Sequence, residues 1–188
     1  MKHVLIYIVL LVIVIAGRCN WVVAESTADT LEYQLEIQYH ETLFASKNQP
    51  ASILNEFTTD GCSGGLSVGW QYLAGKIETF REVHGTHPPW ESCCVSHDKE
   101  YHAGGGPDIS AELSYELRRR ADRILEMCVR DAGGSRAAEL SAVYGISVEE
   151  VRKLYAVVSR LMYRAVRIGG LPCTGLPWRW GYGWPECE

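Results

Sequence analysis

The stretch CCVSHDKEY, residues 93–101, brings two cysteines, a histidine, an aspartate and a tyrosine into one short segment. On a helix, residues three or four positions apart lie on the same face, so Cys94, His97, Asp98 and Tyr101 form a single stripe. A helix face that packs into a core is normally apolar, whereas this stripe combines a crosslinker, a base, an acid and a hydroxyl group. The stretch therefore predicts a helix whose inward face is a chemical site.

Two helices are expected in this part of the chain. The first covers about 91–102, because two prolines precede it and three glycines follow it. The second takes Asp108 or Ser110 as its N-terminal cap, runs to about Val129 and stops near Gly133-Gly134.

A third helix is predicted near the C-terminus. Ser147 and Glu150 form a Ser-x-x-Glu capping box, and Gly169-Gly170 ends the helix. Between them, apolar residues recur at helical spacing, which is typical of an amphipathic helix. These residues are Val151, Leu154, Tyr155, Val158, Leu161, Met162 and Ala165.

Composition places the chain among globular proteins. Its 188 residues allow one domain with appendages, and 47% of them are hydrophobic and 22% charged. The net charge of −5 argues against a nucleic-acid partner. Residues 31–39 alternate like a strand but have the composition of a helix, so both interpretations stay open.

The N-terminus predicts export. A basic start precedes an apolar run at 4–16, which is short for a membrane span and typical of a signal peptide. Val22 and Ala24 then occupy the −3 and −1 cleavage positions. Arg18 is atypical there, so an uncleaved N-terminal membrane anchor is the alternative. In both cases the remainder is expected to be secreted or extracytoplasmic, in the periplasm or cell envelope.

Cysteine usage agrees with export. The chain has seven cysteines, and cleavage after Ala24 removes Cys19 and leaves six. An even number suits three disulfides in an oxidising compartment. Six cysteines permit 15 pairings, so spacing alone does not choose among them.

The pattern Cys-Cys-x-x-His-Asp-x-x-Tyr at 93–101 resembles the active-site helix of secreted phospholipase A2, with all fixed positions present. Thr59 to Ser63 is similar to the calcium loop of the bacterial and fungal branch, the closest branch, where an aspartate lies two residues before the loop cysteine. Asp122 precedes Cys128 by six residues, the spacing of the second aspartate in the animal enzymes. The resemblance extends over about residues 57–170, as separate short segments rather than continuously.

The resemblance implies calcium-dependent hydrolysis of a phospholipid acyl ester at a membrane surface. It implies that His97 activates a water molecule, that Asp122 orients His97, and that Tyr101 supports Asp122. The calcium ligands that it implies are Asp98, Asp60, Gly61, Ser63 and Gly65.

The resemblance also implies a disulfide pattern. It pairs Cys93 with Cys128 and Cys62 with Cys94, and Cys173 and Cys187 are left to pair in the tail. If Cys93 and Cys128 join antiparallel helices, His97 lies about 6 Å and Asp122 about 9 Å from the bridge along the helix axes. The two side chains then reach similar heights.

Two features depart from the family pattern. Cys62 and Cys94 are further apart than in the family, because the stretch Trp70–Pro89 is inserted between them. The insertion is a candidate surface for a protein partner, a candidate lid, or a sign that the calcium loop is built differently from that of the family. Ser63 directly follows Cys62, so the loop spacing is shifted, and Asp98 is the best supported of the implied calcium ligands.

Two segments suggest a membrane contact, each with an alternative. The last helix is basic and is either a solvated face or a patch for anionic lipid; its cations are Arg152, Lys153, Arg160, Arg164 and Arg167. The tail aromatics either cover the core or meet lipid. They are Trp178, Trp180, Tyr182 and Trp184.

Other interpretations of the site residues remain open. His97 and Asp98 alone also fit a surface pair, and Asp122 fits ordinary salt bridges with the arginines around it in the sequence. The loop 60–65 also fits a simple turn. A zinc site is a further alternative, formed by Cys94 and His97 with His84, His87 or His102.

The sequence thus predicts a mainly α fold. A disulfide-stapled antiparallel helix pair carries the active site, with a third amphipathic helix and an irregular tail rich in Trp, Gly and Pro. The expected segments are a signal peptide or anchor (1–24), an N-terminal extension (25–56), a phospholipase A2-like domain (57–170) and an aromatic C-terminal tail (171–188). The functional alternatives are a non-catalytic binding module (toxin-like, inhibitor or envelope-interaction protein) and an esterase or acyltransferase of other specificity.

Overall fold

The computed structural model describes residues 30–62 and 66–187. The predicted signal segment 1–24 and the predicted calcium ligands Ser63 and Gly65 lie outside them. The chain divides into two units, Met1–Gln38 and Tyr39–Glu188, and every contact discussed below lies within the second. Residues 30–47 are helical, which decides the ambiguous segment 31–39 in favour of helix.

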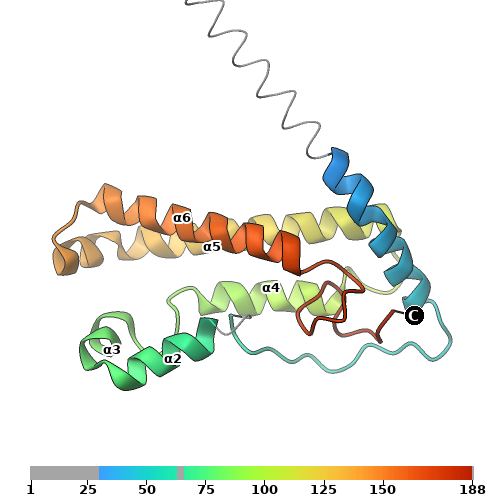
Figure 1. Cartoon of the computed structure of the whole chain (residues 1–188), viewed down its shortest axis with the longest axis horizontal. Helices are drawn as coiled ribbons and strands as arrows, with labels where there is room; N and C mark the ends of the chain where they lie inside the picture. Colours follow the sequence, from blue (N-terminus) through green and yellow to red (C-terminus); the bar gives the residue numbers. More distant parts are fainter. Residues whose placement is uncertain (1–29, 63–65, 188) are drawn as a thin grey trace, which may run out of the picture. The chain divides into compact units, whose positions relative to one another are not determined.

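The second unit is helical, and no strand occurs among the described residues. The prediction of a mainly helical chain is confirmed. In Figure 1, α4 and α5 run antiparallel, and α6 returns alongside α5. The helices are α2 (Leu66–Lys76), α3 (Glu78–His84), α4 (Glu91–Ala103), α5 (Ala111–Tyr144) and α6 (Val148–Gly169).

Three disulfides tie these elements together, as the resemblance implied. Cys93–Cys128 joins α4 to α5, Cys62–Cys94 joins the loop before α2 to α4, and Cys173–Cys187 closes the tail. Because the sulfur of Cys94 is in a disulfide, the zinc interpretation that used this cysteine is wrong. Three disulfides are consistent with an extracellular protein.

The second helix differs from its prediction. Ser110 caps α5, since its Oγ accepts a hydrogen bond from the backbone N–H of Leu113 at 3.2 Å. The predicted stop near Gly133-Gly134 is wrong, because α5 continues to Tyr144. A Cβ at Gly133 would lie 2.1 Å from the ring of Tyr155 on α6, so this glycine lets the two helices approach closely. Packing against α6 outweighs the low helix propensity of glycine.

The predicted capping box of α6 is confirmed, with Ser147 and Glu150 bonding each other's backbone N–H groups. Val151 and Tyr155 are buried in a core formed with α5. Leu154 and Leu161 belong to the same apolar repeat, but both are more than half exposed. The apolar arc of α6 is therefore wider than the face that α5 covers.

The tail 171–187 is irregular, as predicted, and packs over the ends of α4 and α5. The indole N–H of the fully buried Trp180 donates to Ser114 Oγ, and that of Trp184 donates to the carbonyl oxygen of Ala103, each at 2.9 Å. These two tryptophans cover the core, whereas Trp178 is exposed.

In the part of the chain that the structure describes, no helix has the length and apolarity needed to cross a bilayer.

Candidate active site

The predicted stripe on α4 is buried although it is polar. Cys94, His97, Asp98 and Tyr101 are each at most 8% exposed. The helix ends at Gly104, whose left-handed backbone (φ 55°) suits glycine. Burying polar groups is costly unless they find partners, so the contacts of these side chains define what the site can do.

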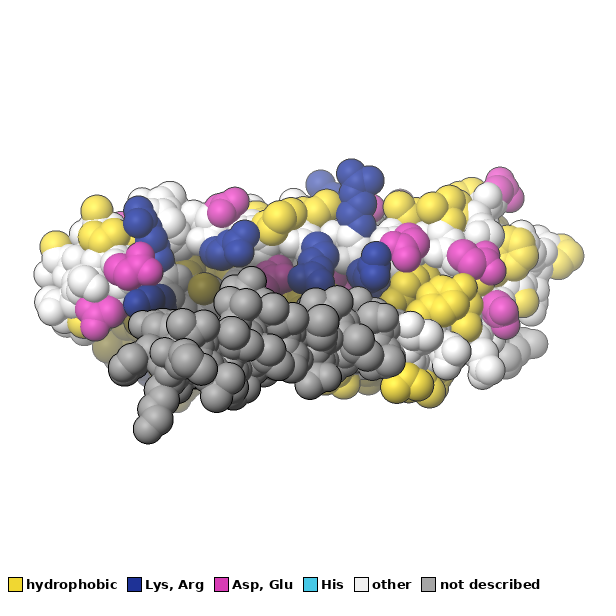
Figure 2. Space-filling view, turned by 90° about the horizontal axis from the view of Figure 1, so that it is seen from above, with side chains coloured by type: hydrophobic (Ala, Val, Ile, Leu, Met, Phe, Trp, Pro, Cys, Tyr) yellow, Lys and Arg dark blue, Asp and Glu magenta, His cyan; other side chains and the backbone are white. Residues whose placement is uncertain are grey.

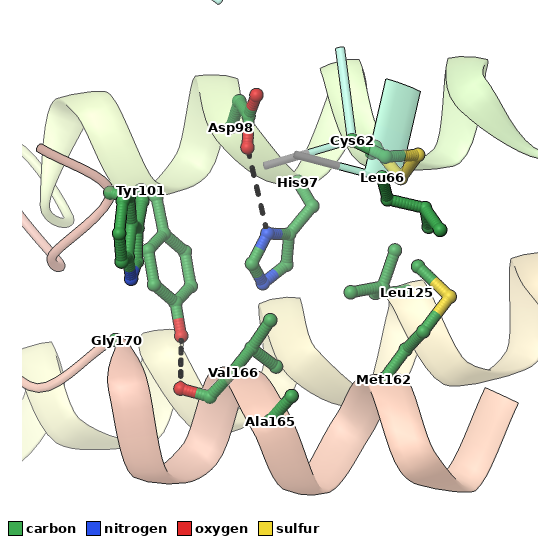
Figure 3. A pocket seen from close by; sticks show the side chains of 12 residues that line it. Cys62, Leu66, His97, Asp98, Tyr101, Leu125, Met162, Ala165, Val166 and Gly170 are labelled. Atoms are coloured by element: carbon green, nitrogen blue, oxygen red, sulfur yellow. Dashed lines mark hydrogen bonds and ion pairs between the residues drawn. A yellow bond between two sulfur atoms is a disulfide. The ribbon is translucent and has the colours of Figure 1, made fainter. Parts of the chain in front are cut away.

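His97 is held by Asp122 of α5. Its Nε2 lies 2.8 Å from Asp122 Oδ1, and the Tyr101 hydroxyl donates to the same oxygen at 2.7 Å. In the neutral imidazole, a carboxylate acceptor holds the proton on Nε2, so Nδ1 is the atom that can act as a base. Nδ1 lies 4.0 Å from Asp98 Oδ1, too far for a hydrogen bond and drawn as a dashed line in Figure 3.

Two buried arginines complete this network, and the sequence analysis did not place either of them beside His97. Arg167 of α6 donates to Asp122 Oδ2 at 3.0 Å. Arg118 donates to the Tyr101 hydroxyl at 3.1 Å and to the carbonyl oxygens of Val166 and Arg167 at 2.8 Å. The interpretation of Arg167 as part of an exposed basic face is wrong, since the side chain is buried. Asp122 forms a salt bridge with Arg167 of α6, and the charge of Arg118, one of the arginines near it in the sequence, also acts on it.

These contacts set the ionisation of the network. Burial alone would raise the pKa of Asp122, but the His97 hydrogen bond and the Arg118 charge hold this pKa below its ordinary value. Burial and the Asp122 charge raise the pKa of Tyr101, so its hydroxyl stays protonated and donates. Asp122 is thus an ionised acceptor at neutral pH.

His97 faces an apolar cavity of about 310 Å³ between α4, α5 and α6. In Figure 3, His97 and Tyr101 point from α4 towards α6, and apolar side chains surround the space beside them. The cavity accommodates an apolar chain next to the base. Its other lining residues are Cys62, Leu66, Cys94, Asp98, Leu125, Met162, Ala165, Val166, Gly170 and Trp178.

A second cavity of about 320 Å³ shares Asp98 and Trp178 with the first. It is also lined by Asp60, Thr58, Thr59, Pro177 and Tyr182, so it is more acidic. The Thr59 hydroxyl donates to Asp98 Oδ2 at 2.6 Å. Burial raises the pKa of Asp98, the Thr59 hydrogen bond and the His97 charge partly offset this, and the Asp60 charge raises it further.

The second cavity offers oxygen donors to a cation. Calcium prefers the oxygens of carboxylates, carbonyl groups and water, and Asp60 and Asp98 supply two carboxylates here. Gly61 lies in the same loop, with its N–H donated to Thr59 Oγ1 at 3.1 Å. Within residues 30–62 and 66–187, no group of three or more His, Cys, Asp or Glu side chains is placed to hold a metal. A full calcium site therefore requires backbone carbonyl oxygens or water.

A scan against protein-family models and searches of curated proteins and solved structures found no match to the chain. The functional conclusion therefore depends on the side-chain geometry. Of the predicted site residues, His97, Asp122, Tyr101 and Asp98 lie together, and Asp60 lines the cavity that Asp98 shares.

Proposed function

We propose that this chain is a calcium-dependent hydrolase of phospholipid acyl esters, of the secreted phospholipase A2 type. The observation that carries the proposal is the position of the His97–Asp122 pair. It lies on the wall of an apolar cavity whose neighbour presents the carboxylates of Asp98 and Asp60. A base, an apolar site and an acidic site thus lie side by side.

In the proposed reaction, water attacks the ester carbonyl carbon and passes a proton to Nδ1 of His97. Cys93 and Cys94, the cysteines nearest to His97 in the sequence, are in disulfides and do not act as nucleophiles. Asp122 stabilises the imidazolium through Nε2–H, which is the role of an orienting carboxylate. The imidazolium then returns the proton to the oxygen of the leaving alcohol, and a fatty acid and a lysophospholipid result.

The acidic cavity would hold calcium. Asp98 and Asp60 would bind it, with the predicted backbone oxygens of Gly61, Ser63 and Gly65. Bound calcium supplies Lewis-acid polarisation of the ester carbonyl and offsets the developing oxyanion charge. The apolar cavity would hold the acyl chain, because its walls are largely aliphatic and aromatic.

Secretion is part of the proposal. The three disulfides persist best in an oxidising compartment outside the cytoplasm. The N-terminal segment supports export as a signal peptide or as an anchor.

The test is fatty-acid release from phospholipid vesicles with calcium or with a chelator. His97→Gln removes the base, and we expect it to lower the rate about 10²–10⁴-fold. The matched control is His87→Gln, at an exposed histidine just before α4, which should keep full activity. Calcium-independent release, or equal rates for His97→Gln and the wild type, would refute the proposal. Lipid or protein binding that persists in His97→Gln, without hydrolysis by the wild type, would favour the non-catalytic module.

A further inference from the structure

Another cavity, of about 180 Å³, lies between the inserted helices α2 and α3 and the connected ends of α5 and α6. These elements lie towards the left of Figure 1. The cavity shares no lining residue with the two cavities that His97 and Asp98 line. The proposed reaction therefore gives it no role.

The wall of this cavity is rich in aromatic rings. Five of its ten lining residues are aromatic, namely Trp70, His84, Trp90, Tyr144 and Tyr155. The ring of Trp90 stands edge-on to those of Trp70 and Tyr155, with ring centroids 5.5 and 5.6 Å apart. Aromatic side chains favour such edge-to-face contacts with further rings. An apolar cavity of about 150 Å³ holds one benzene molecule, so this cavity accommodates a single ring.

The two tryptophans of the wall each leave a hydrogen-bond donor unused. The indole Nε1 atoms of Trp70 and Trp90 are buried and have no acceptor among the described residues. Trp180 and Trp184 do have acceptors, each at 2.9 Å. A buried indole N–H normally finds a partner. The two unused donors therefore indicate a ligand that brings an acceptor oxygen with it.

The wall is uncharged at neutral pH. None of the ten lining residues is Asp, Glu, Lys or Arg. Burial and the nearby Arg136 charge lower the pKa of His84, and the Glu139 charge offsets this only in part. Arg136 is itself paired, since it donates to Glu139 Oε1 and to the carbonyl oxygen of Val83, each at 2.7 Å. A neutral ligand fits this wall better than an ion does.

Exposure of apolar side chains alone does not mark a ligand site on this protein. Figure 2, seen from the side on which α5 and α6 lie, shows apolar side chains at several places among charged ones. Such exposure is normal for soluble proteins. Two neighbours on α6 show the difference, because Val158 lines the cavity, whereas Val157 is 56% exposed and lines none of the three cavities described above.

We propose that this cavity binds a small neutral molecule that carries one aromatic ring and one carbonyl group. The ring lies against Trp70, Trp90 and Tyr155, and the carbonyl oxygen accepts a hydrogen bond from the indole N–H of Trp70 or Trp90. Binding requires neither His97 nor calcium, so the inference goes beyond the proposed function and is tested separately from it.

The experiment follows the indole N–H resonances by NMR while acetophenone is added in the presence of a chelator. The protein is the isotope-labelled, exported product of the full chain. We expect the resonance of Trp70 or Trp90 to move downfield, because a new hydrogen bond deshields the proton. Those of Trp180 and Trp184 should stay in place, since both already donate to protein oxygens. Unchanged resonances of Trp70 and Trp90, or equal shifts at all four residues, would overturn the inference.

Three further probes separate the features of the ligand. Ethylbenzene lacks the carbonyl group and should bind without the downfield shift. Cyclohexyl methyl ketone lacks the aromatic ring and should bind about 2–10-fold more weakly than acetophenone. Tetramethylammonium should not bind, because no carboxylate lines the cavity. Equal binding of the two ketones, or binding of tetramethylammonium in place of acetophenone, would contradict the proposed ligand class.

A matched pair of variants locates the site. Val158→Phe fills the cavity and should weaken acetophenone binding about tenfold or more. Val157→Phe adds the same ring outside the cavity and should bind as the wild type does. Urea denaturation checks that both variants are folded. Equal affinity of Val158→Phe and the wild type, or equal loss in the two variants, would overturn the inference.

Lipid hydrolysis keeps this inference distinct from the proposed function. His97→Gln should bind acetophenone as the wild type does, and Val158→Phe should hydrolyse phospholipid at the wild-type rate. Loss of acetophenone binding in His97→Gln would contradict a separate site. Acetophenone binding by a wild-type protein that hydrolyses nothing would support this site and refute the enzyme alone.

Discussion

Asp98 and Asp122 are both buried carboxylates, yet their surroundings shift their pKa values in opposite directions. Asp122 is contacted by His97, Tyr101 and Arg167, and its pKa is lowered in spite of complete burial. Burial raises the pKa of Asp98; hydrogen bonding to Thr59 and the His97 charge offset this only in part, and the Asp60 charge adds to it.

The difference separates two roles for buried charge. Side chains of the protein itself offset the negative charge of Asp122. This suits a residue that must stay ionised and hold an imidazole in place. Asp98 receives less compensation from the described residues and lines a cavity with a second carboxylate. A bound cation from solution would stabilise the ionised form of Asp98 more than that of Asp122.

The largest expected effect is the loss of stability when the negative charge of Asp122 is removed. Asp122→Asn leaves Arg167 and Arg118 buried without their carboxylate, so we expect the free energy of unfolding to fall by about 3–5 kcal/mol. Urea denaturation measures it. The control is Asp131→Asn at an exposed position of the same helix, which should change little. Equal stability of the two variants would mean that Asp122 is not the centre of the network.

A second prediction concerns Asp98, the carboxylate with less compensation. Asp98→Asn should lower the rate of lipid hydrolysis about 10²-fold or more, because the oxyanion loses its electrostatic stabilisation. Without calcium, the Asp98→Asn variant should be no less stable than the wild type, because the substitution removes a buried negative charge. Rates at saturating calcium and urea denaturation in a chelator test both parts. If Asp98→Asn lowered the free energy of unfolding as much as Asp122→Asn does, the proposed difference between the two carboxylates would be wrong.

Tyr101→Phe is expected to have an intermediate effect. It removes one hydrogen bond to Asp122 and the acceptor for Arg118 Nε. A buried donor left unsatisfied costs about 1–3 kcal/mol of stability. Thermal and urea unfolding of the variant measure this cost. A change below the experimental error would show that the hydroxyl contributes nothing to the network.

The smallest effect is a difference in pH dependence. A raised pKa in the folded state means that Asp98 contributes stability at low pH and loses it as the pH rises through that pKa. The contribution of Asp122, whose pKa is lowered, is instead lost as the pH falls through its lowered value. As the pH rises above the ordinary pKa of an aspartate, calcium-free wild type should therefore lose stability relative to Asp98→Asn. Parallel melting-temperature curves for the two proteins would contradict the raised pKa.

The sequence predicted the features that depend on local spacing. The stripe of Cys94, His97, Asp98 and Tyr101 follows from helical periodicity, because all four lie on a single helix. The pairing of Asp122 with His97 came from the resemblance and from counting residues along two bridged helices. Both depend on positions within a few turns of a disulfide.

The features that sequence analysis missed depend on how α5 meets α6. Arg167 lies 45 positions from Asp122, and no local pattern fixes the register that brings them together. Gly133 has the local character of a helix end, but its contact with Tyr155 gives it a packing role. Leu161 matches the buried periodicity of its helix, and only the partner helix determines that it stays exposed.

Calcium titration by calorimetry, comparing wild type with Asp98→Asn and Asp131→Asn, tests the central claim most directly. We predict calcium binding by the wild type and by Asp131→Asn, and a loss of affinity in Asp98→Asn. Wild-type protein that binds no calcium, or Asp98→Asn that binds it as tightly as the wild type, would contradict the proposed hydrolase.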